Sequence, residues 1–319
     1  MNKNLTFAAA KIQTTFGTAI AITPASDYLQ VSECEIEPNQ LMDKVKILSG
    51  KFTTEPSVVS NLNVTVKGKI PLVSGGLEAA PPCGPLLEAA GFIATVDTAP
   101  TDGSKFIYTR SLTTKDLSMN HYSMKGSNAI IKAANSIIMN SIKIAIESGK
   151  VPMLDFSGVG LAGGASALAF LTTGAVTAPT QTKNIYYCVN DVSATLLDTS
   201  YELVKADIDI VNKVTQKPVM TGFGFGYGEI RDEESKFNCS TLLDTSMTLQ
   251  PLNRIRSSVT PGTFTMTFGS IAKQKVSIST TKAQLISCKD SMQGDLLSSD
   301  ISGEYIDNEI VITFNSDIT

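Results

Sequence analysis

The sequence contains no tryptophan and a single histidine, His121, and only 18 % of its residues are charged. A nucleophile activated by an imidazole base would have to use that one histidine. His121 lies between Asn120 and Tyr122, and no Gly-x-Ser-x-Gly motif occurs in the chain. The lack of tryptophan and of a convergent pair of acids also gives a glycosidase no basis. We therefore expect a protein that is not an enzyme and that holds no cofactor.

Excess positive charge and paired cysteines are absent as well. The formal net charge is −4, so the chain lacks the basic surface of a protein that grips duplex DNA. The cysteines are odd in number, widely separated and without a Cys-x-x-Cys pair, which favours reduced thiols over a disulfide frame or a zinc site. They are Cys34, Cys83, Cys188, Cys239 and Cys288. We expect no metal site, because Asp207 and Asp209 fit a solvated strand face as well as a Ca²⁺ ligand pair.

One stretch has the length and lack of charge of a membrane span. It covers residues 159–178, about 20 residues, which meets the length rule for a transmembrane helix. It contains several glycines and threonines and has no flanking basic cluster. We interpret it as the end of a strand that leads into a small-residue linker, and expect no membrane insertion.

Alternation of apolar and polar residues is the strongest positive signal. It predicts strands with one buried and one solvated face, at residues 62–72, 142–147, 203–210, 263–268, 276–278 and 310–314. Helix signals are few: residues 85–91 combine Pro at the first turn with Gly after the end, and residues 251–258 give a weaker candidate. The sequence therefore predicts an all-β fold with one short flanking helix per domain.

A repeated block indicates an internal duplication. Gly149-Lys-Val-Pro-Met-Leu-Asp-Phe-Ser-Gly158 aligns without a gap on Gly294-Asp-Leu-Leu-Ser-Ser-Asp-Ile-Ser-Gly303. Each block follows an alternating strand, and each half has a strand, a Pro-Leu helix candidate and a Phe-containing strand (residues 106–109 or 264–268) upstream. We predict an N-terminal arm over residues 1–26, a first β-domain over 27–170, a linker over 171–177 and a second β-domain over 178–319.

A series of motifs in fixed order resembles the tail tube proteins of long-tailed, siphovirus-type bacteriophages. The resemblance covers about residues 7–161, and it lies in the order of the motifs, none of which is specific alone. The motifs are Lys11-Ile-Gln-Thr-Thr-Phe-Gly-Thr18, Asp27-Tyr-Leu-Gln-Val-Ser-Glu33, Gly84-Pro-Leu-Leu-Glu-Ala-Ala-Gly-Phe92, Phe106-Ile-Tyr-Thr-Arg-Ser-Leu-Thr113 and Pro152-Met-Leu-Asp-Phe-Ser-Gly158. The sequence from His121 to Gly126 departs from the family, which often has an aspartate-rich turn there.

This resemblance implies a β-sandwich or barrel whose copies close into rings, and rings that stack into a tube through which DNA passes during ejection. The duplication then favours a trimer with pseudo-sixfold symmetry, with a hexamer as the alternative. The implied partners are other copies of the chain, stacked rings, the tape measure, terminator and distal tail proteins, and genomic DNA in transit. The implied location is the virion tail, after assembly in the host cytoplasm.

The resemblance also places candidate contact and lumen residues. The family has a long hairpin or loop near residues 39–57 that reaches neighbouring subunits, and the N-terminal arm is a second candidate for stacking. The contact candidates are therefore Phe7, Phe16, Lys44, Lys46, Lys51 and Phe52. A lumen that lets DNA slide should not be basic, and the acidic C-terminal segment offers Asp295, Asp300, Glu304, Asp307 and Glu309. An ordinary solvated face explains those acids equally well.

Two other functions remain open. A phage decoration protein or a receptor- or carbohydrate-binding protein would share the Ser/Thr-rich β composition, although such sites usually display aromatic side chains. The inner tube of a contractile injection device would share the fold of a tail tube.

Overall fold

The computed structural model describes residues 6–39, 42–44, 57–59, 63–75, 79–97, 105–111, 113–163, 170–179, 192–197, 199–218, 225–242, 251–257, 260–269, 275–293 and 296–315. These residues form 20 β-strands, two short α-helices and one 3₁₀ turn, Ile306–Asn308. The all-β fold predicted from the alternation is confirmed. Antiparallel pairing joins 18 of the strands into one large sheet.

The first half of the chain contributes a unit of seven strands. They pair in the spatial order β2–β1–β9–β10–β11–β6–β3. Their bounds are β1 Thr6–Ile12, β2 Tyr28–Leu29, β3 Glu33–Asn39, β6 Asn63–Pro71, β9 Leu117–Lys125, β10 Asn128–Glu147 and β11 Met153–Ala162. Helix α1 (Gly84–Ala89) follows β6 in the chain and buries Leu86 and Leu87.

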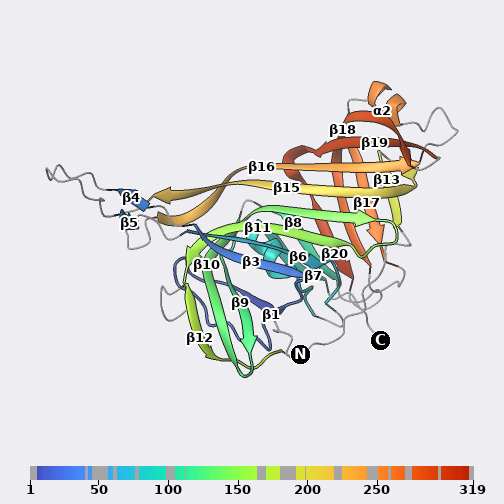
Figure 1. Ribbon diagram of the computed structural model, residues 1–319. Coiled ribbons are helices and arrows are strands. Elements are labelled where there is room, and N and C mark those ends of the chain that lie inside the picture. Colours follow the sequence, from blue (N-terminus) through green and yellow to red (C-terminus); the bar gives the residue numbers. More distant parts are fainter. Residues whose placement is uncertain are drawn as a thin grey trace.

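The second half repeats this arrangement. Seven strands pair in the order β14–β13–β17–β18–β19–β16–β15, and helix α2 (Pro251–Ser257) again follows the sixth strand of that order. The strands are β13 Val192–Leu196, β14 Thr199–Tyr201, β15 Leu203–Pro218, β16 Phe225–Leu242, β17 Gly262–Phe268, β18 Val276–Gln293 and β19 Leu296–Tyr305. Chain order, pairing order and helix position all agree, so the duplication expected from the sequence is present in the topology. The two units lie side by side, the first in blue and green and the second in yellow to red (Figure 1).

The topology corrects how the two halves match. The sequence comparison set residues 106–109 against 264–268, but the strand equivalent to β17 is β9, since both precede the long strand of a hairpin. Strand β8 (Lys105–Arg110) instead forms an inserted hairpin with β7 (Phe92–Asp97). That hairpin joins the second unit, because β8 pairs with β20 (Val311–Asn315), which pairs with β18. Alternation predicts strands well, but it does not identify their partners.

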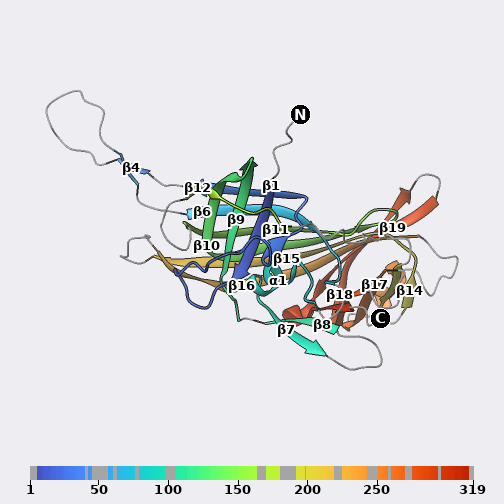
Figure 2. The same cartoon turned by 90° about the horizontal axis from the view of Figure 1, so that it is seen from below.

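Two segments expected outside the domains belong to the sheet. Residues 1–26 were expected to form an arm, yet β1 pairs along its whole length with β9. The expected linker, 171–177, contains β12 (Leu171–Ala175), which pairs with the start of β10. By contrast, β4 (Met42–Lys44) and β5 (Ser57–Val59) pair with each other in a separate two-stranded ribbon at one end of the molecule (Figures 1 and 2).

One large apolar core runs through both units, and a smaller cluster around Phe7 and Tyr122 lies beside it. The large core includes Val66, Ile144 and Leu154 of the first unit and Ile208 and Ile278 of the second, each with its side chain fully or almost fully buried. These residues are the apolar positions of the alternating patterns, so the faces predicted to be buried are buried. Among the described residues, no helix is long and apolar enough to cross a membrane.

Candidate assembly interface

The two units are joined edge to edge by β10 and β15. Residues Ser141–Glu147 of β10 pair with Val211–Lys205 of β15 in an unbroken antiparallel register. On one face Ile142, Ile144 and Ile146 are buried against the core, as are Ile210, Ile208 and Ala206 opposite them. Long β10 can do this because its first half pairs with β9 and its second half with β15. We call this pairing the occupied joint.

Charge complementarity reinforces the occupied joint on its solvated face. The Lys143 ammonium lies 3.5 Å from a carboxylate oxygen of Asp207 and 3.8 Å from one of Asp209. Asp207 also pairs with Lys205 at 3.1 Å. Opposite charges across neighbouring strands stabilise a sheet modestly, by roughly 0.2–1 kcal/mol a pair. Their larger value here is to fix which strands meet and in which register.

A buried polar cluster also connects the units. Arg110 of β8 forms an ion pair with Glu233 of β16, and only 3 % and 14 % of these side chains are exposed. The Arg110 guanidinium donates hydrogen bonds to the Ala90 carbonyl and to Asn212 of β15. Asn212 in turn donates to the Ala90 and Met139 carbonyls at 3.0 and 2.8 Å. Burial lowers the pKa of Arg110, and the neighbouring Glu233 carboxylate opposes that shift.

A row of alternating charges crosses both units on the solvated face. Each member of the row is the register partner of the next, on seven successive strands from β3 to β19. The row is Glu33, Lys69, Asp155, Lys143, Asp209, Lys236 and Glu304. Because acids and bases alternate, this row forms no basic stripe. A basic stripe would bind the phosphates of DNA and release counterions. We call this set the charged row.

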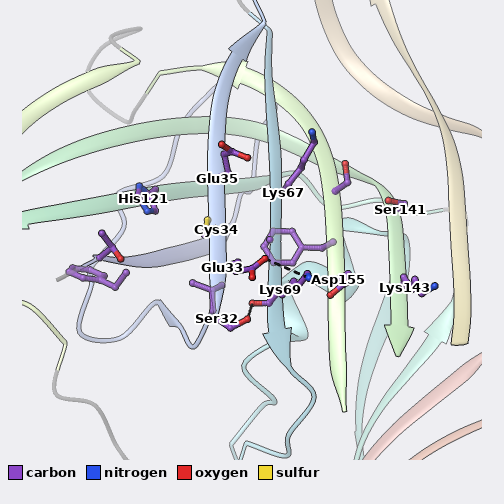
Figure 3. A pocket seen from close by; sticks show the side chains of 16 residues that line it. Ser32, Glu33, Cys34, Glu35, Lys67, Lys69, His121, Ser141, Lys143 and Asp155 are labelled. Carbon is purple, nitrogen blue, oxygen red and sulfur yellow. Dashed lines mark hydrogen bonds and ion pairs between the residues drawn. The ribbon is translucent and has the colours of Figure 1, made fainter. Parts of the chain in front are cut away.

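At the far end of the first unit, β3 has an unpaired edge. Among the described residues, β3 pairs with β6 alone. A groove of about 750 Å³ surrounds this edge and is lined by Val31, Ser32, Glu33, Cys34 and Glu35 together with residues of β1, β6, β9, β10 and β11. Figure 3 shows His121 on one side of β3 and Lys67, Ser141 and Lys143 on the other. Glu33 contacts Lys69 at 3.7 Å, and the side chains of Glu35 and Glu37 are exposed along the same strand.

The equivalent groove of the second unit is much smaller. Its lining includes Leu203–Ala206, the segment of β15 that corresponds to residues 31–34 before and within β3. Ile146 and Ser148, from the end of β10 and just beyond it, line it as well, and its volume is only about 10 Å³. The same position is therefore occupied in one unit and open in the other. This contrast singles out the β3 edge as the candidate site.

A second strand segment is unpaired on one edge. Residues Ser287–Gln293 of β18 pair with β19 and, within the part of the chain that the structure describes, with no strand on the other side. They correspond to residues 141–147 of β10, which pair with β11 and also with β15. An unpaired edge presents free backbone N–H and C=O groups to another strand.

The expected contact residues lie in different places. Phe7 is buried on β1, where its ring stacks on Tyr122 with 4.7 Å between centroids, so it anchors β1 within the unit. Phe16 lies in the turn after β1 and is half-buried. Lys44 ends β4 in the projecting ribbon. Lys46, Lys51 and Phe52 lie outside the described residues.

The expected lumen acids are paired with cations or hydroxyls. Asp300 accepts a hydrogen bond from Ser240 at 2.6 Å. Lys282 contacts Asp307 at 2.8 Å and Glu309 at 3.4 Å, and Glu304 belongs to the charged row. Asp295 lies outside the described residues. Sequence reasoning missed the bases that alternate with these acids, because the row is built from strands far apart in the chain.

Of the histidine and cysteine side chains weighed for chemistry, the structure describes His121 and four of the cysteines. His121 is half-buried on β9, where burial and nearby Lys132 lower the pKa of its imidazole. Burial raises the pKa of Cys34, Cys83 and Cys239 to about 12, so these thiols are unreactive. No group of three or more His, Cys, Asp or Glu side chains in the described ranges is placed to hold a metal ion.

No model of a protein family matches the chain, and no curated protein matches it. A proposal of function therefore depends on the strand edges, the groove and the charged row.

Proposed function

We propose that this protein is a structural subunit that assembles with copies of itself into rings of the bacteriophage tail-tube type. The single observation that supports this is the occupied joint, in which two like units join edge to edge. Among the described residues, the edge of β3 and the edge of residues 287–293 of β18 are left without a strand partner. A contact between unlike edges is heterologous, and repetition of it closes a ring when the rotation closes. Three copies, each with two units, would supply a ring of six units.

The charged row supports the second part of the proposal, a conduit for DNA. Its seven members alternate in sign along the register of the continuous sheet. We place this face on the inside of the ring, where balanced charge would let DNA slide with few lasting phosphate contacts. The expected partners then are copies of the chain, stacked rings, other tail proteins and passing DNA, and the expected location is the virion tail.

Negative-stain electron microscopy of the purified protein tests the proposal. We expect rings or short tubes with a central hole, in amounts that increase with protein concentration. Monomeric particles at every concentration, together with specific hits on a glycan array, would instead support a decoration or carbohydrate-binding protein. A tube of a contractile injection device would give the same images, and a sheath gene beside this one would distinguish it.

A further inference from the structure

The open edges of β3 and β18 are equivalent to the two strands of the occupied joint. Ile144 pairs with Leu154 in β11, and Asp290 pairs with Ser299 in β19, at matching positions of the aligned blocks. On the other side, Ile36 of β3 is separated from β11 by β6 in the way that Ile208 of β15 is separated from β19 by β16. Ile36 and Ile208 both have fully buried side chains.

We propose that Ser287–Gln293 of β18 in one copy pairs with β3 of a second copy and fills its groove. This inference rests on the proposed self-assembly and names the surfaces that perform it. Repeating the register of the occupied joint sets Asp290 opposite Ile36. It also gives the pairs Lys289 with Glu37, Ser291 with Glu35, Met292 with Cys34 and Gln293 with Glu33.

Charge complementarity supports this register. In the occupied joint, Lys143 faces Asp207 and Asp209. In the proposed contact, Lys289 takes the place of Lys143, and Glu35 and Glu37 take the places of the two aspartates. Lys289, Glu35 and Glu37 are all exposed in the isolated chain. The proposed contact therefore repeats the arrangement of the occupied joint, in which one lysine lies between two acids. Here the lysine comes from the C-terminal part of the sequence and the two glutamates come from the N-terminal part.

The groove and the backbone support the same occupant. In the second unit the groove is lined by Ile146 of β10, and the register places Met292 of β18 at the equivalent position. Ser148 N–H donates to the Val204 carbonyl at 3.0 Å, and the register then makes Ile144 and Ile208 a hydrogen-bonded pair. By equivalence, Ile36 and Pro38 direct their backbone groups to the open edge. Pro38 has no N–H, so the contact lacks one backbone hydrogen bond at that position and relies on the other backbone groups of the edge.

Charge reversal tests the contact in the full-length protein. Lys289→Glu sets an acid against Glu35 and Glu37, and we expect the protein concentration needed for ring formation to rise at least about tenfold. The double change Glu35→Lys with Glu37→Lys should do the same. Combining all three changes restores opposite charges and should restore assembly. Lys125→Glu, at the exposed end of β9 and outside the charged row, is the matched control and should assemble normally.

Disulfide trapping tests the register itself. Glu35→Cys with Ser291→Cys places two thiols on facing positions, where Cβ atoms lie about 4.5–5.5 Å apart. We expect reducible dimers and trimers on a denaturing gel, whereas either change alone should give monomers. Ala145→Cys with Asp207→Cys, the equivalent pair within the occupied joint, should form an intramolecular bond and serves as the positive control.

The results of these experiments distinguish a failure of this contact from a failure of the proposed function. Rings that form normally with Lys289→Glu, and that give no cross-link in the double-cysteine variant, would overturn the contact but leave the tube proposal standing. A wild-type protein that forms no ring under any condition would overturn both. Circular dichroism and thermal unfolding of the charge-reversal variants at Lys289, Glu35 and Glu37 should match the wild type, since these three side chains are exposed.

Discussion

The occupied joint and the open edge of β3 are the same structural position, and they differ in what covers them. In the second unit, β15 is paired on both edges, and the end of β10 lines an adjoining groove of only about 10 Å³. In the first unit, β3 has one strand neighbour among the described residues and a groove of about 750 Å³ beside it. Natural proteins cover or blunt exposed edges. The second unit, in which β10 pairs with β15, shows how the exposed edge of β3 can be covered.

The two surfaces that meet these edges also differ in polarity. The β10 segment presents Ile142 and Ile144 on its core face, both almost fully buried. The equivalent positions in β18 are Cys288, which is half-buried, and Asp290, which is exposed and accepts a hydrogen bond from Ser299 at 3.4 Å. A joint formed within one chain can be as apolar as a core. A surface that must stay soluble before it meets another copy is more polar.

The largest expected effect is on the polar cluster that holds the occupied joint. Arg110→Ala leaves the Glu233 carboxylate buried without its partner and removes the link to Asn212. Removing one member of a buried pair typically costs about 3–5 kcal/mol. We expect a loss of that size in the free energy of unfolding, measured by urea denaturation.

Arg231→Ala is the matched control for that change. Arg231 lies on the same strand as Glu233, but 55 % of its side chain is exposed and its ion pair with Glu229 spans 3.5 Å. Its removal should change stability by less than about 0.5 kcal/mol. Equal effects of the two substitutions would mean that the cluster does not hold the units together.

A smaller effect distinguishes the two equivalent edges directly. Ala206→Pro removes a backbone donor from the occupied joint and leaves a carbonyl of β10 unsatisfied. We expect it to lower the free energy of unfolding by about 1–3 kcal/mol. Cys34→Pro makes the equivalent change in β3, where the edge has no strand partner among the described residues. The monomer should lose less stability, while ring formation should fail.

Thermal unfolding and electron microscopy of both proline variants check this prediction. A Cys34→Pro variant that still forms rings would exclude pairing through β3. Equal destabilisation of the two variants would mean that the backbone of Cys34 is already hydrogen-bonded within its own chain. Cys34→Ala controls for loss of the thiol and should leave both stability and assembly unchanged.

Single strands, their buried faces and one helix could be predicted from the sequence. Period-two alternation predicted β6, β17 and the core faces of β10 and β15, because a half-buried strand needs that pattern whatever its partner. Pro85 and Gly91 bounded α1 in the same way. The aligned Gly158 and Gly303 revealed the repeat, since they occupy equivalent positions within β11 and β19.

Which strands pair with each other could not be predicted from the sequence. The pairing of β10 with β15, the insertion of β7 and β8 against β20 and the charged row all depend on contacts between residues distant in the chain. The acidic segment therefore looked unbalanced, although Lys236 and Lys282 lie against its acids. Residues 1–26 looked like an arm because β1 is short and rich in alanine, and its partner β9 lies about a hundred residues later.

The smallest expected effect concerns a difference in titration between the units. Asp116 precedes β9, and burial raises the pKa of its carboxyl to about 6. The equivalent strand β17 is preceded by Thr260 and Pro261, which do not titrate. Because the folded state holds the Asp116 proton more tightly than the unfolded state does, stability should fall as the pH rises from about 4 to about 6. Asp116→Asn removes that penalty, so its melting temperature should exceed that of the wild type at pH 7.

That gain should disappear at pH 3.5, where Asp116 is protonated in both states and the asparagine no longer differs from it in charge. Asp155→Asn is the matched control, since Asp155 lies on the solvated charged row beside Lys69 and Lys143. Its substitution should not stabilise the protein at pH 7. A gain for Asp116→Asn of the same size at both pH values would show that side-chain packing, and not ionisation, distinguishes the entry to β9 from the entry to β17.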